Sequence, residues 1–195
     1  MPREFFAALA AVSAALLVWQ LVEYGGASQA FYDSDTYFRA WDYIKTIHSH
    51  QTRPPLYPLF AGGLRDLAGV PAMRVIVALV QWGMFVAVLP LAWQLCRRLG
   101  AGVILSGVVV SLYLIVPGFW VLNNAVLPES MCGSLILLLL WLVMVTIDSG
   151  SSRTMAWSAI TILVMAMLKP AFVYLVAVIP IAWFTVTRKR DPGMR

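Results

Sequence analysis

Charged side chains are scarce in this chain. Only 12% of its 195 residues are Asp, Glu, Lys or Arg, whereas 61% are hydrophobic. A soluble domain carries roughly a quarter charged residues, so the composition excludes an ordinary water-soluble domain. No basic stretch is long enough to follow a phosphate backbone, which argues against nucleic acid as a partner. The mean hydropathy of +0.82 predicts an integral membrane protein of one compact unit.

Cysteine and histidine are also rare, with two of each in the chain. Cys96 and Cys132 are far apart in the sequence and lie near or within apolar runs. We expect packed free thiols there rather than a disulfide or a metal-binding pair. We interpret His48 and His50 as exposed loop residues near a membrane interface rather than as metal ligands.

The apolar residues are gathered in long runs, which predict an all-α polytopic membrane protein. A spanning helix needs about 20 apolar residues, and four runs approach this length. The first has no small-residue cleavage motif at its end, so we expect a retained anchor. A longer run is broken only at Lys169-Pro170, where proline disfavours a continuous helix. The six predicted spans are 5–24, 73–95, 101–120, 130–147, 155–168 and 171–186.

Basic residues predict how these spans are oriented. Six spans place both termini on one side, together with Arg97-Arg98 and Arg153. The positive-inside rule makes that side the cytoplasm. The loops 25–72 and 121–129 and the Lys169 break then face outward, and we expect a bacterial inner (plasma) membrane. Residues 1–187 form the predicted transmembrane domain, and 188–195 form a basic cytoplasmic tail that we expect to be disordered.

The outer loop 25–72 contains a predicted amphipathic helix over 36–48. Aromatic and charged residues alternate there, as in a helix that lies in the headgroup layer. Ser34 or Asp35 is the predicted N-cap, because a side-chain oxygen satisfies free backbone amides. That role does not require Asp33. The Asp33-Ser34-Asp35 pattern also suits a divalent cation, so metal binding stays an open alternative and no cofactor is certain.

The segment Arg53-Pro54-Pro55-Leu56-Tyr57-Pro58 is stiff, because its prolines fix φ. The apolar stretch Leu59–Leu67 that follows could form a short re-entrant helix. Arg53 would then lie at headgroup depth, either as an interfacial anchor or as a phosphate clamp, since guanidinium matches phosphate oxygens in a bidentate way.

Glu129 follows Pro128 at the outer mouth of the fourth predicted span. One interpretation is a first-turn acid that the helix dipole favours. The other is a functional acid, because Asn123 and Asn124 precede it and Lys169 is predicted on the same face. Charge next to hydrocarbon is expensive, so such a cluster is by default a candidate site.

The ordered set of motifs resembles a known family. Tyr32-Asp33-Ser34-Asp35-Thr36-Tyr37, then Arg53-Pro54-Pro55-Leu56-Tyr57-Pro58, then Leu127-Pro128-Glu129-Ser130 is similar to the GT-C integral-membrane glycosyltransferases. Within them, the dolichyl-phosphate-mannose mannosyltransferase and aminoarabinose transferase group is the nearest. The resemblance covers residues 1 to about 187 and implies sugar transfer from a polyprenyl-phosphate-linked donor on the non-cytoplasmic face.

The resemblance also implies roles for single residues. Asp33 matches the catalytic aspartate of the first loop in that family, and Glu129 matches the second acidic position. Arg53 matches the basic residue that faces the lipid phosphate. Tyr37 matches the tyrosine that closes the first motif. The family often has an acid at the position of Ser34, so the choice of base between Asp33 and Asp35 stays open. Further substrate-binding candidates are Tyr57, Asn124 and Lys169.

One departure from the family concerns the number of spans. Members usually continue with more spans and often with a soluble outer domain. We therefore expect a minimal enzyme, a truncated member, or one subunit of a split enzyme with a second membrane subunit as partner. The alternative function is a non-catalytic membrane subunit or a lipid-carrier translocator that retains the scaffold.

Overall fold

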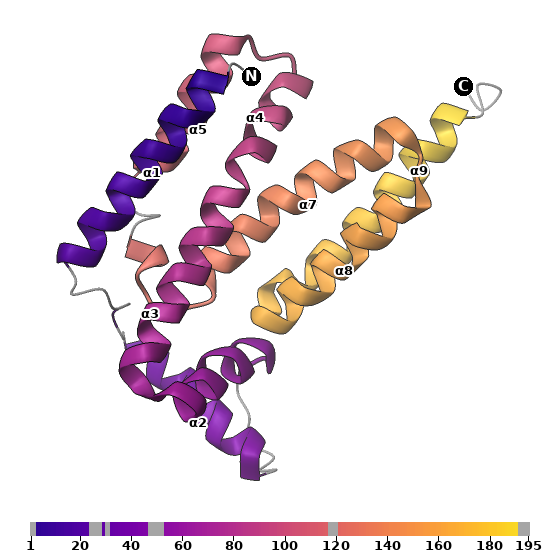
Figure 1. The fold of residues 1–195 in the computed structure, drawn as a ribbon. Helices are drawn as coiled ribbons and strands as arrows, with labels where there is room; N and C mark the ends of the chain where they lie inside the picture. Colours follow the sequence, from indigo (N-terminus) through magenta and orange to yellow (C-terminus); the bar gives the residue numbers. More distant parts are fainter. Residues whose placement is uncertain (1–2, 24–28, 30–31, 47–52, 117–120, 191–195) are drawn as a thin grey trace.

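The computed structural model describes residues 3–23, 29, 32–46, 53–116 and 121–190 (Figure 1). This part of the chain is mostly helical and contains no strand, in agreement with the predicted all-α class. The helices are α1 (Arg3–Glu23), α2 (Tyr32–Thr46), η1 (Pro58–Gly62), α3 (Gly63–Ala87), α4 (Leu89–Arg98), α5 (Val103–Ile115), α7 (Glu129–Ser149), α8 (Ser152–Leu168), η2 (Pro170–Ala177) and α9 (Val178–Arg190).

Two helical stretches are long and apolar enough to cross a membrane. They are Pro58–Arg98, with a mean hydropathy of 2.3, and Glu129–Ser149, with a mean hydropathy of 2.4. The other predicted spans fall on shorter apolar helices: Ala7–Trp19, Val103–Ile115, Ser152–Leu168 and Pro170–Val186. The described part of each predicted span therefore contains a helix, and two of the helical stretches have the length and composition of a membrane-crossing helix.

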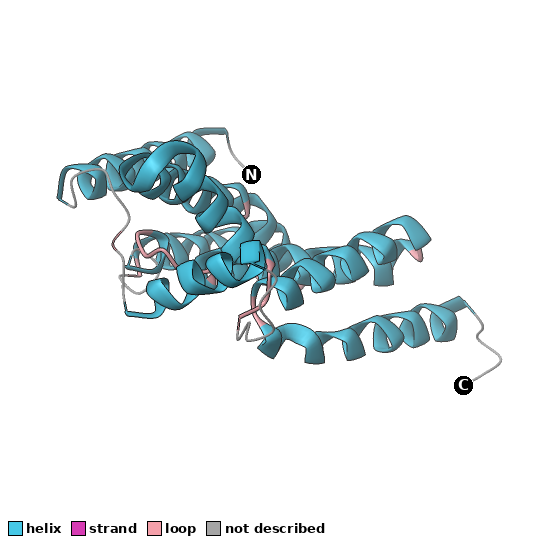
Figure 2. Cartoon of the chain, turned by 90° about the horizontal axis from the view of Figure 1, so that it is seen from below, coloured by secondary structure: helices cyan, strands magenta, loops and turns pink. Residues whose placement is uncertain are grey.

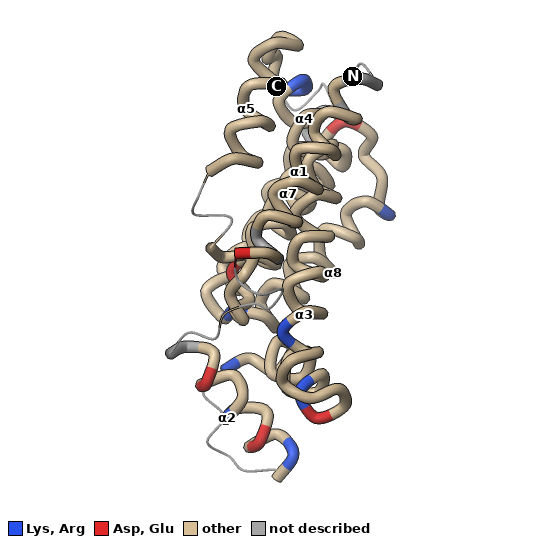
Figure 3. Tube along the Cα trace, turned by 60° about the vertical axis from the view of Figure 1, so that its left-hand side comes forward, with Lys and Arg blue, Asp and Glu red and all other residues tan. Residues whose placement is uncertain are grey.

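The helix ends separate into two groups in space. The first turn of α1, the α4–α5 connection and the last turn of α9 lie at one end of the molecule, whereas α2 lies at the other (Figure 1). Charged residues gather around α2 and the start of α3 and are sparse along the middle of the helices (Figure 3). Viewed from below, the C-terminal helices extend away from the helices near the N-terminus (Figure 2).

The core consists of three buried apolar clusters. One joins α1, α3, α4 and α5 around Trp82, Phe85 and Trp93. A second joins α2, η1, α3 and the start of α7 around Tyr37 and Tyr57. A third joins α7 and α8. Because α7 packs against α3, α4, α8 and α9, it links the N-terminal and C-terminal helices.

The predicted break at Lys169-Pro170 is confirmed. Helix α8 ends at Leu168, Lys169 has extended backbone angles (φ −150°, ψ 123°), and the 3₁₀ helix η2 begins at Pro170. The predicted free thiols are also confirmed, since neither Cys96 nor Cys132 forms a disulfide.

Two local predictions need correction. Helix α2 begins at Tyr32 rather than at residue 36, so Ser34 and Asp35 lie in its first turn and the predicted N-cap role is wrong. The Ser34 hydroxyl instead donates a hydrogen bond to the Val126 carbonyl at 3.0 Å. Helix α9 continues through Arg190, so the first residues of the predicted disordered tail are helical.

The predicted re-entrant segment is helical but is not separated from the helix that follows. Residues 58–68 run into α3, and the direction changes at Gly69, where φ is 77° and ψ is 166°. Positive φ at this position favours glycine because it has no Cβ. The kink orients the segment 58–68 toward α2.

Candidate functional site

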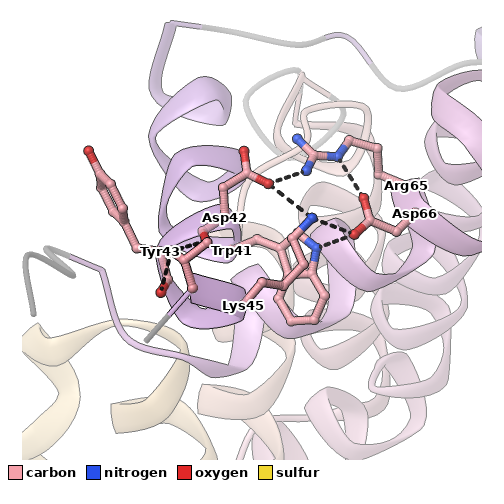
Figure 4. Close-up of polar contacts among 7 residues, drawn as sticks. Trp41, Asp42, Tyr43, Lys45, Arg65 and Asp66 are labelled. Carbon is pink, nitrogen blue, oxygen red and sulfur yellow. Dashed lines mark hydrogen bonds and ion pairs between the residues drawn. The ribbon is translucent and has the colours of Figure 1, made fainter. Parts of the chain in front are cut away.

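Helix α2 is held on the start of α3 by a network of ion pairs (Figure 4). Arg65 binds Asp42 at 2.7 Å and Asp66 at 3.3 Å. Lys45 binds Asp66 at 2.8 Å and Asp42 at 3.2 Å. The Trp41 indole donates a hydrogen bond to Asp66 at 2.8 Å. We call these four charges and Trp41 the α2–α3 network.

The electrostatics of the α2–α3 network favour the charged forms. Slight burial acts to raise the pKa of Asp42, but hydrogen bonds from Arg65 and Lys45 outweigh it and hold that pKa below its ordinary value of 3.8. The pKa of Lys45 is raised, mainly by its hydrogen bond to Asp66. The network therefore holds α2 against the start of α3, and Tyr37 of α2 packs in the buried cluster around Tyr57.

Arg53 precedes η1 in the chain and lies against α2. Its Nε donates a hydrogen bond to the Thr36 hydroxyl at 3.0 Å. Its guanidinium lies 4.9 Å from the centre of the Tyr37 ring, which is within the range of a cation–π contact. Two residues of α2 thus hold the arginine in place, and it is only partly buried.

Tyr37, which contacts Arg53, packs in turn against Tyr57 in the buried part of the fold. Their ring centres are 5.0 Å apart in an edge-to-face arrangement, a preferred geometry for aromatic pairs. Both side chains are buried, and Tyr57 has no exposed surface. Burial raises the pKa of Tyr57 well above its ordinary value, and Tyr37 and Glu129 act in the same direction, whereas a hydrogen bond with the Gln81 side chain acts to lower it.

Glu129, which also acts electrostatically on Tyr57, forms an ion pair with Lys169. Lys169 Nζ lies 2.8 Å from Glu129 Oε1, and the two side chains are 37% and 28% exposed. Glu129 begins α7, and Lys169 is the extended residue between α8 and η2. The second carboxylate oxygen, Oε2, is buried and has no partner within the described part of the chain.

Arg53, Tyr37, Tyr57, Glu129 and Lys169 therefore lie in sequence across one site, which we call the α7 mouth. They come from α2, the segment before η1, the start of α7 and the α8–η2 break. All five were candidates from the sequence alone, and the structure brings them together from distant parts of the chain.

Gln81 is a residue that sequence reasoning missed. It lies in α3 without exposed surface. Its Nε2 donates a hydrogen bond to the Leu127 carbonyl at 2.6 Å, and its Oε1 has no partner among the described atoms. The available signal was an amide side chain inside an apolar run, which is costly unless it is satisfied.

The remaining candidates are less central. Asn124 is buried, and its carbonyl accepts a hydrogen bond from the Gln29 amide at 2.5 Å. Asp35 is exposed on α2, and none of the described hydrogen bonds or ion pairs of the α7 mouth reaches it. The Asp33 side chain, His48 and His50 lie outside the described residues. Within the described ranges, no group of three or more His, Cys, Asp or Glu could hold a metal ion.

Apolar cavities occur away from this site. One of about 470 Å³ lies between α1, α4 and α5 and is lined by Phe5, Trp93 and Gly107, among others. Smaller ones of about 270 Å³ and about 190 Å³ also border α1. None of their lining residues belongs to the α7 mouth, so the polar site and these apolar cavities are separate features.

A scan of protein-family models and searches of curated proteins and of solved structures each return no match to this chain. The similarity to GT-C enzymes therefore depends on the sequence motifs, and the α7 mouth depends on its geometry.

Proposed function

We propose that this chain is a membrane glycosyltransferase that moves a sugar from a polyprenyl-phosphate-linked donor to an acceptor at the α7 mouth. The observation that carries the proposal is the row of contacts from Arg53 through Tyr37 and Tyr57 to Glu129 and Lys169. The motifs that resemble GT-C enzymes supply three of the four segments that meet there.

The chemistry of such a transfer matches the residues at hand. A carboxylate removes a proton from the acceptor hydroxyl as that hydroxyl attacks the anomeric carbon. A cation stabilises the departing lipid phosphate. In our proposal Asp33 is the base, with Asp35 as the alternative, and Arg53 and Lys169 face the phosphate. Glu129 orients the acceptor.

The proposal includes a membrane orientation. Six helices span the bilayer or enter it, and the end that carries α2 faces outward. This agrees with the helix ends in Figure 1, where the first turn of α1 and the last turn of α9 share the opposite end. A Ser49→Cys variant should be labelled by an impermeant thiol reagent in intact cells. Labelling only after the membrane is opened would contradict this orientation.

The catalytic proposal is tested by turnover of purified protein with radiolabelled polyprenyl-phosphate sugars, assayed alone and with the product of a neighbouring gene. Asp33→Asn keeps size and hydrogen bonding but cannot accept the proton. Loss of a general base costs about a hundredfold to ten-thousandfold in rate, while donor binding should survive. The turnover of Asp33→Asn is compared with that of Asp35→Asn at matched expression.

Each outcome of that comparison is informative. Loss of turnover in Asp35→Asn with an active Asp33→Asn would exchange the two roles. Normal turnover in both variants would contradict catalysis by this acidic pair.

The alternative is a non-catalytic membrane subunit or lipid-carrier translocator. One observation favours it: Lys169 already engages one oxygen of Glu129 at 2.8 Å, so the pair could serve only to join α7 to the α8–η2 break. Binding of polyprenyl phosphate without any turnover, alone or with the second protein, would support this alternative.

A further inference from the structure

The apolar cavity of about 470 Å³ is a groove between α1, α4 and α5. Phe5 of α1 and Trp93 of α4 both line it, and their ring centres are 5.3 Å apart. A Cβ at Gly107 of α5 would lie 3.3 Å from the Phe5 ring and 3.6 Å from the Trp93 ring. Because glycine has no Cβ, α5 approaches this aromatic pair closely. The groove is therefore formed where the three helices meet.

Helix α5 gives this groove its length. Ile104, Val108 and Leu112 all line it, and their side chains are 84%, 48% and 52% exposed. Residues four apart lie on the same face of a helix, so the three form one continuous apolar stripe. From Ile104 to Leu112 the helix rises about 12 Å, at about 1.5 Å per residue. The groove therefore runs parallel to the axis of α5.

A cation lies at one end of the groove. Arg97 is exposed in the last turn of α4, four residues after Trp93 and on the same face of that helix. Its Nη1 donates a hydrogen bond to the Ala101 carbonyl at 2.6 Å, and Val103, two residues further along the chain, lines the groove. None of the ion pairs formed with described carboxylates includes Arg97. The apolar groove thus ends at a positive charge that no described acid neutralises.

The size of the groove indicates what kind of molecule fits it. A volume of about 470 Å³ spread over about 12 Å gives a cross-section of about 40 Å². A helix with side chains is at least about 10 Å across and would need about 80 Å², so a partner helix is too wide, whereas a hydrocarbon chain is not. Cations at a membrane surface attract anionic lipids. A hydrocarbon chain with an anionic head therefore matches both the groove and its charged end.

We propose that the groove between α1, α4 and α5 binds an acyl chain of an anionic phospholipid, with the lipid phosphate against Arg97, and that this lipid completes the packing of α1. A guanidinium forms charge-assisted hydrogen bonds with phosphate oxygens. A second cavity of about 190 Å³ also lies between α1 and α5, so side chains alone leave α1 incompletely packed there. The groove lies toward the α4–α5 end of the molecule, opposite α2 (Figure 1), and the proposal is independent of sugar transfer at the α7 mouth.

The probes are dioctanoyl phosphatidylglycerol, which is anionic, and dioctanoyl phosphatidylcholine, which has no net charge. Each is titrated into the purified protein in a neutral maltoside detergent. Native mass spectrometry counts the bound lipids, and the shift in unfolding temperature reports the affinity. We expect one phosphatidylglycerol per chain, bound about tenfold more tightly than phosphatidylcholine because of its charge-assisted contact.

Val108→Trp fills the groove, and Val109→Trp is its matched control. Val109 is the next residue of the same helix and is 41% exposed, but it lines none of the three apolar cavities. Val108→Trp should weaken binding of both lipids about tenfold or more, as expected when the binding space is occupied, and Val109→Trp should weaken neither. Leu112→Trp, with the same expected result, replaces Val108→Trp if that variant unfolds at a lower temperature without lipid.

Arg97→Gln tests the charged end of the groove. It should reduce the affinity for phosphatidylglycerol to that for phosphatidylcholine and leave the phosphatidylcholine affinity unchanged. Arg153→Gln is the control, since Arg153 is exposed near the start of α8 and lines none of the three cavities. It should keep the tenfold preference.

Four results would overturn the proposal. Equal losses in Val108→Trp and Val109→Trp would mean that the lipid binds elsewhere, and equal losses in Arg97→Gln and Arg153→Gln would mean a general attraction between charges. Displacement of phosphatidylglycerol by an equal concentration of decaprenyl phosphate would make the lipid carrier the occupant. A dimeric parent protein that becomes monomeric on Val108→Trp would make the groove a contact between two copies of the chain.

Discussion

The α2–α3 network and the α7 mouth are both polar, but they differ in whether their polar atoms have partners within the chain. In the network, Asp42 and Asp66 each bind both Lys45 and Arg65, largely in contact with solvent. In the α7 mouth, Oε2 of Glu129 is buried without a partner among the described residues. One region has completed its interactions within the chain, whereas the other keeps a buried carboxylate oxygen that a ligand would satisfy.

This difference separates structural charge from functional charge. Exposed ion pairs contribute about 0.2–1 kcal/mol each to stability. Each ion pair of the network therefore stabilises the fold only slightly, although together they orient α2. Buried unpartnered groups reduce stability, and natural proteins retain such groups mainly where function requires them. Composition alone does not distinguish the two regions, because both combine carboxylates, cations and aromatic rings.

The largest expected effect concerns the contact beneath the α2–α3 network. A Cβ added at Gly62 would overlap Trp41, lying 2.6 Å from its Cδ1 and closer still to its Cβ and Cγ. Gly62→Ala should therefore lower the free energy of unfolding by about 1–3 kcal/mol, as overpacking does. Thermal unfolding in detergent measures this.

Gly63→Ala is the matched control for that prediction. A Cβ at Gly63 meets no described atom within 4 Å, and alanine is favoured over glycine in a helix by about 0.5–1 kcal/mol. We expect this variant to be as stable as the parent protein or more so. Equal destabilisation by both substitutions would mean that α2 is not packed against η1 as described.

A smaller effect is expected at the α7 mouth. Lys169→Met leaves the partly buried Glu129 carboxylate without its cation. Losing a partner of a fully buried pair costs about 3–5 kcal/mol and an exposed pair about 0.2–1 kcal/mol, so we expect about 1–2 kcal/mol here. Chemical denaturation measures the change.

The double variant Lys169→Met with Glu129→Gln tests whether that loss comes from the unpaired charge. It should recover part of the stability, because no charge then remains without its partner. A double variant as unstable as the sum of the two single ones would mean that the residues do not interact.

The smallest effect is expected within the α2–α3 network. Asp42→Asn should cost about 0.5 kcal/mol, and salt should reduce that cost because the charges are exposed. Since the folded pKa of Asp42 lies below its ordinary value of 3.8, its contribution is present above about pH 4 and is lost as the pH falls through the folded pKa. Trp41 fluorescence during acid titration follows this loss, and a response in Asp42→Asn equal to that of the parent protein would contradict it.

Much of the helical framework could be predicted from the sequence. Apolar runs located every long helix, and the proline rule located the break after Leu168. Local patterns failed at the start of α2, because Ser34 binds the Val126 carbonyl 92 residues away rather than a nearby amide. The N-cap rule considers only neighbouring backbone groups and has no information about such a long-range partner.

The candidate site could be predicted only in part, for a related reason. Glu129 and Lys169 were recognisable because charge is rare in apolar surroundings. Gln81 carries no charge and belongs to no motif, and its importance depends on the Leu127 carbonyl opposite. The α2–α3 network requires the kink at Gly69 and the docking of α2, neither of which leaves a local pattern in the sequence.

The most direct test of the account compares two arginines that each lie over an aromatic ring. Arg53 lies 4.9 Å from the Tyr37 ring centre and Arg65 lies 5.2 Å from the Phe38 ring centre. The measurement is the affinity for decaprenyl phosphate, together with thermal stability, of Arg53→Ala and Arg65→Ala. We predict that Arg53→Ala weakens binding of decaprenyl phosphate about tenfold or more, as the loss of a charge-assisted contact does. Arg65→Ala should bind decaprenyl phosphate normally. Arg53→Ala should be at least as thermally stable as Arg65→Ala. Equal affinity in both variants, or weaker binding in Arg65→Ala alone, would contradict the division between a structural network and a ligand-binding mouth.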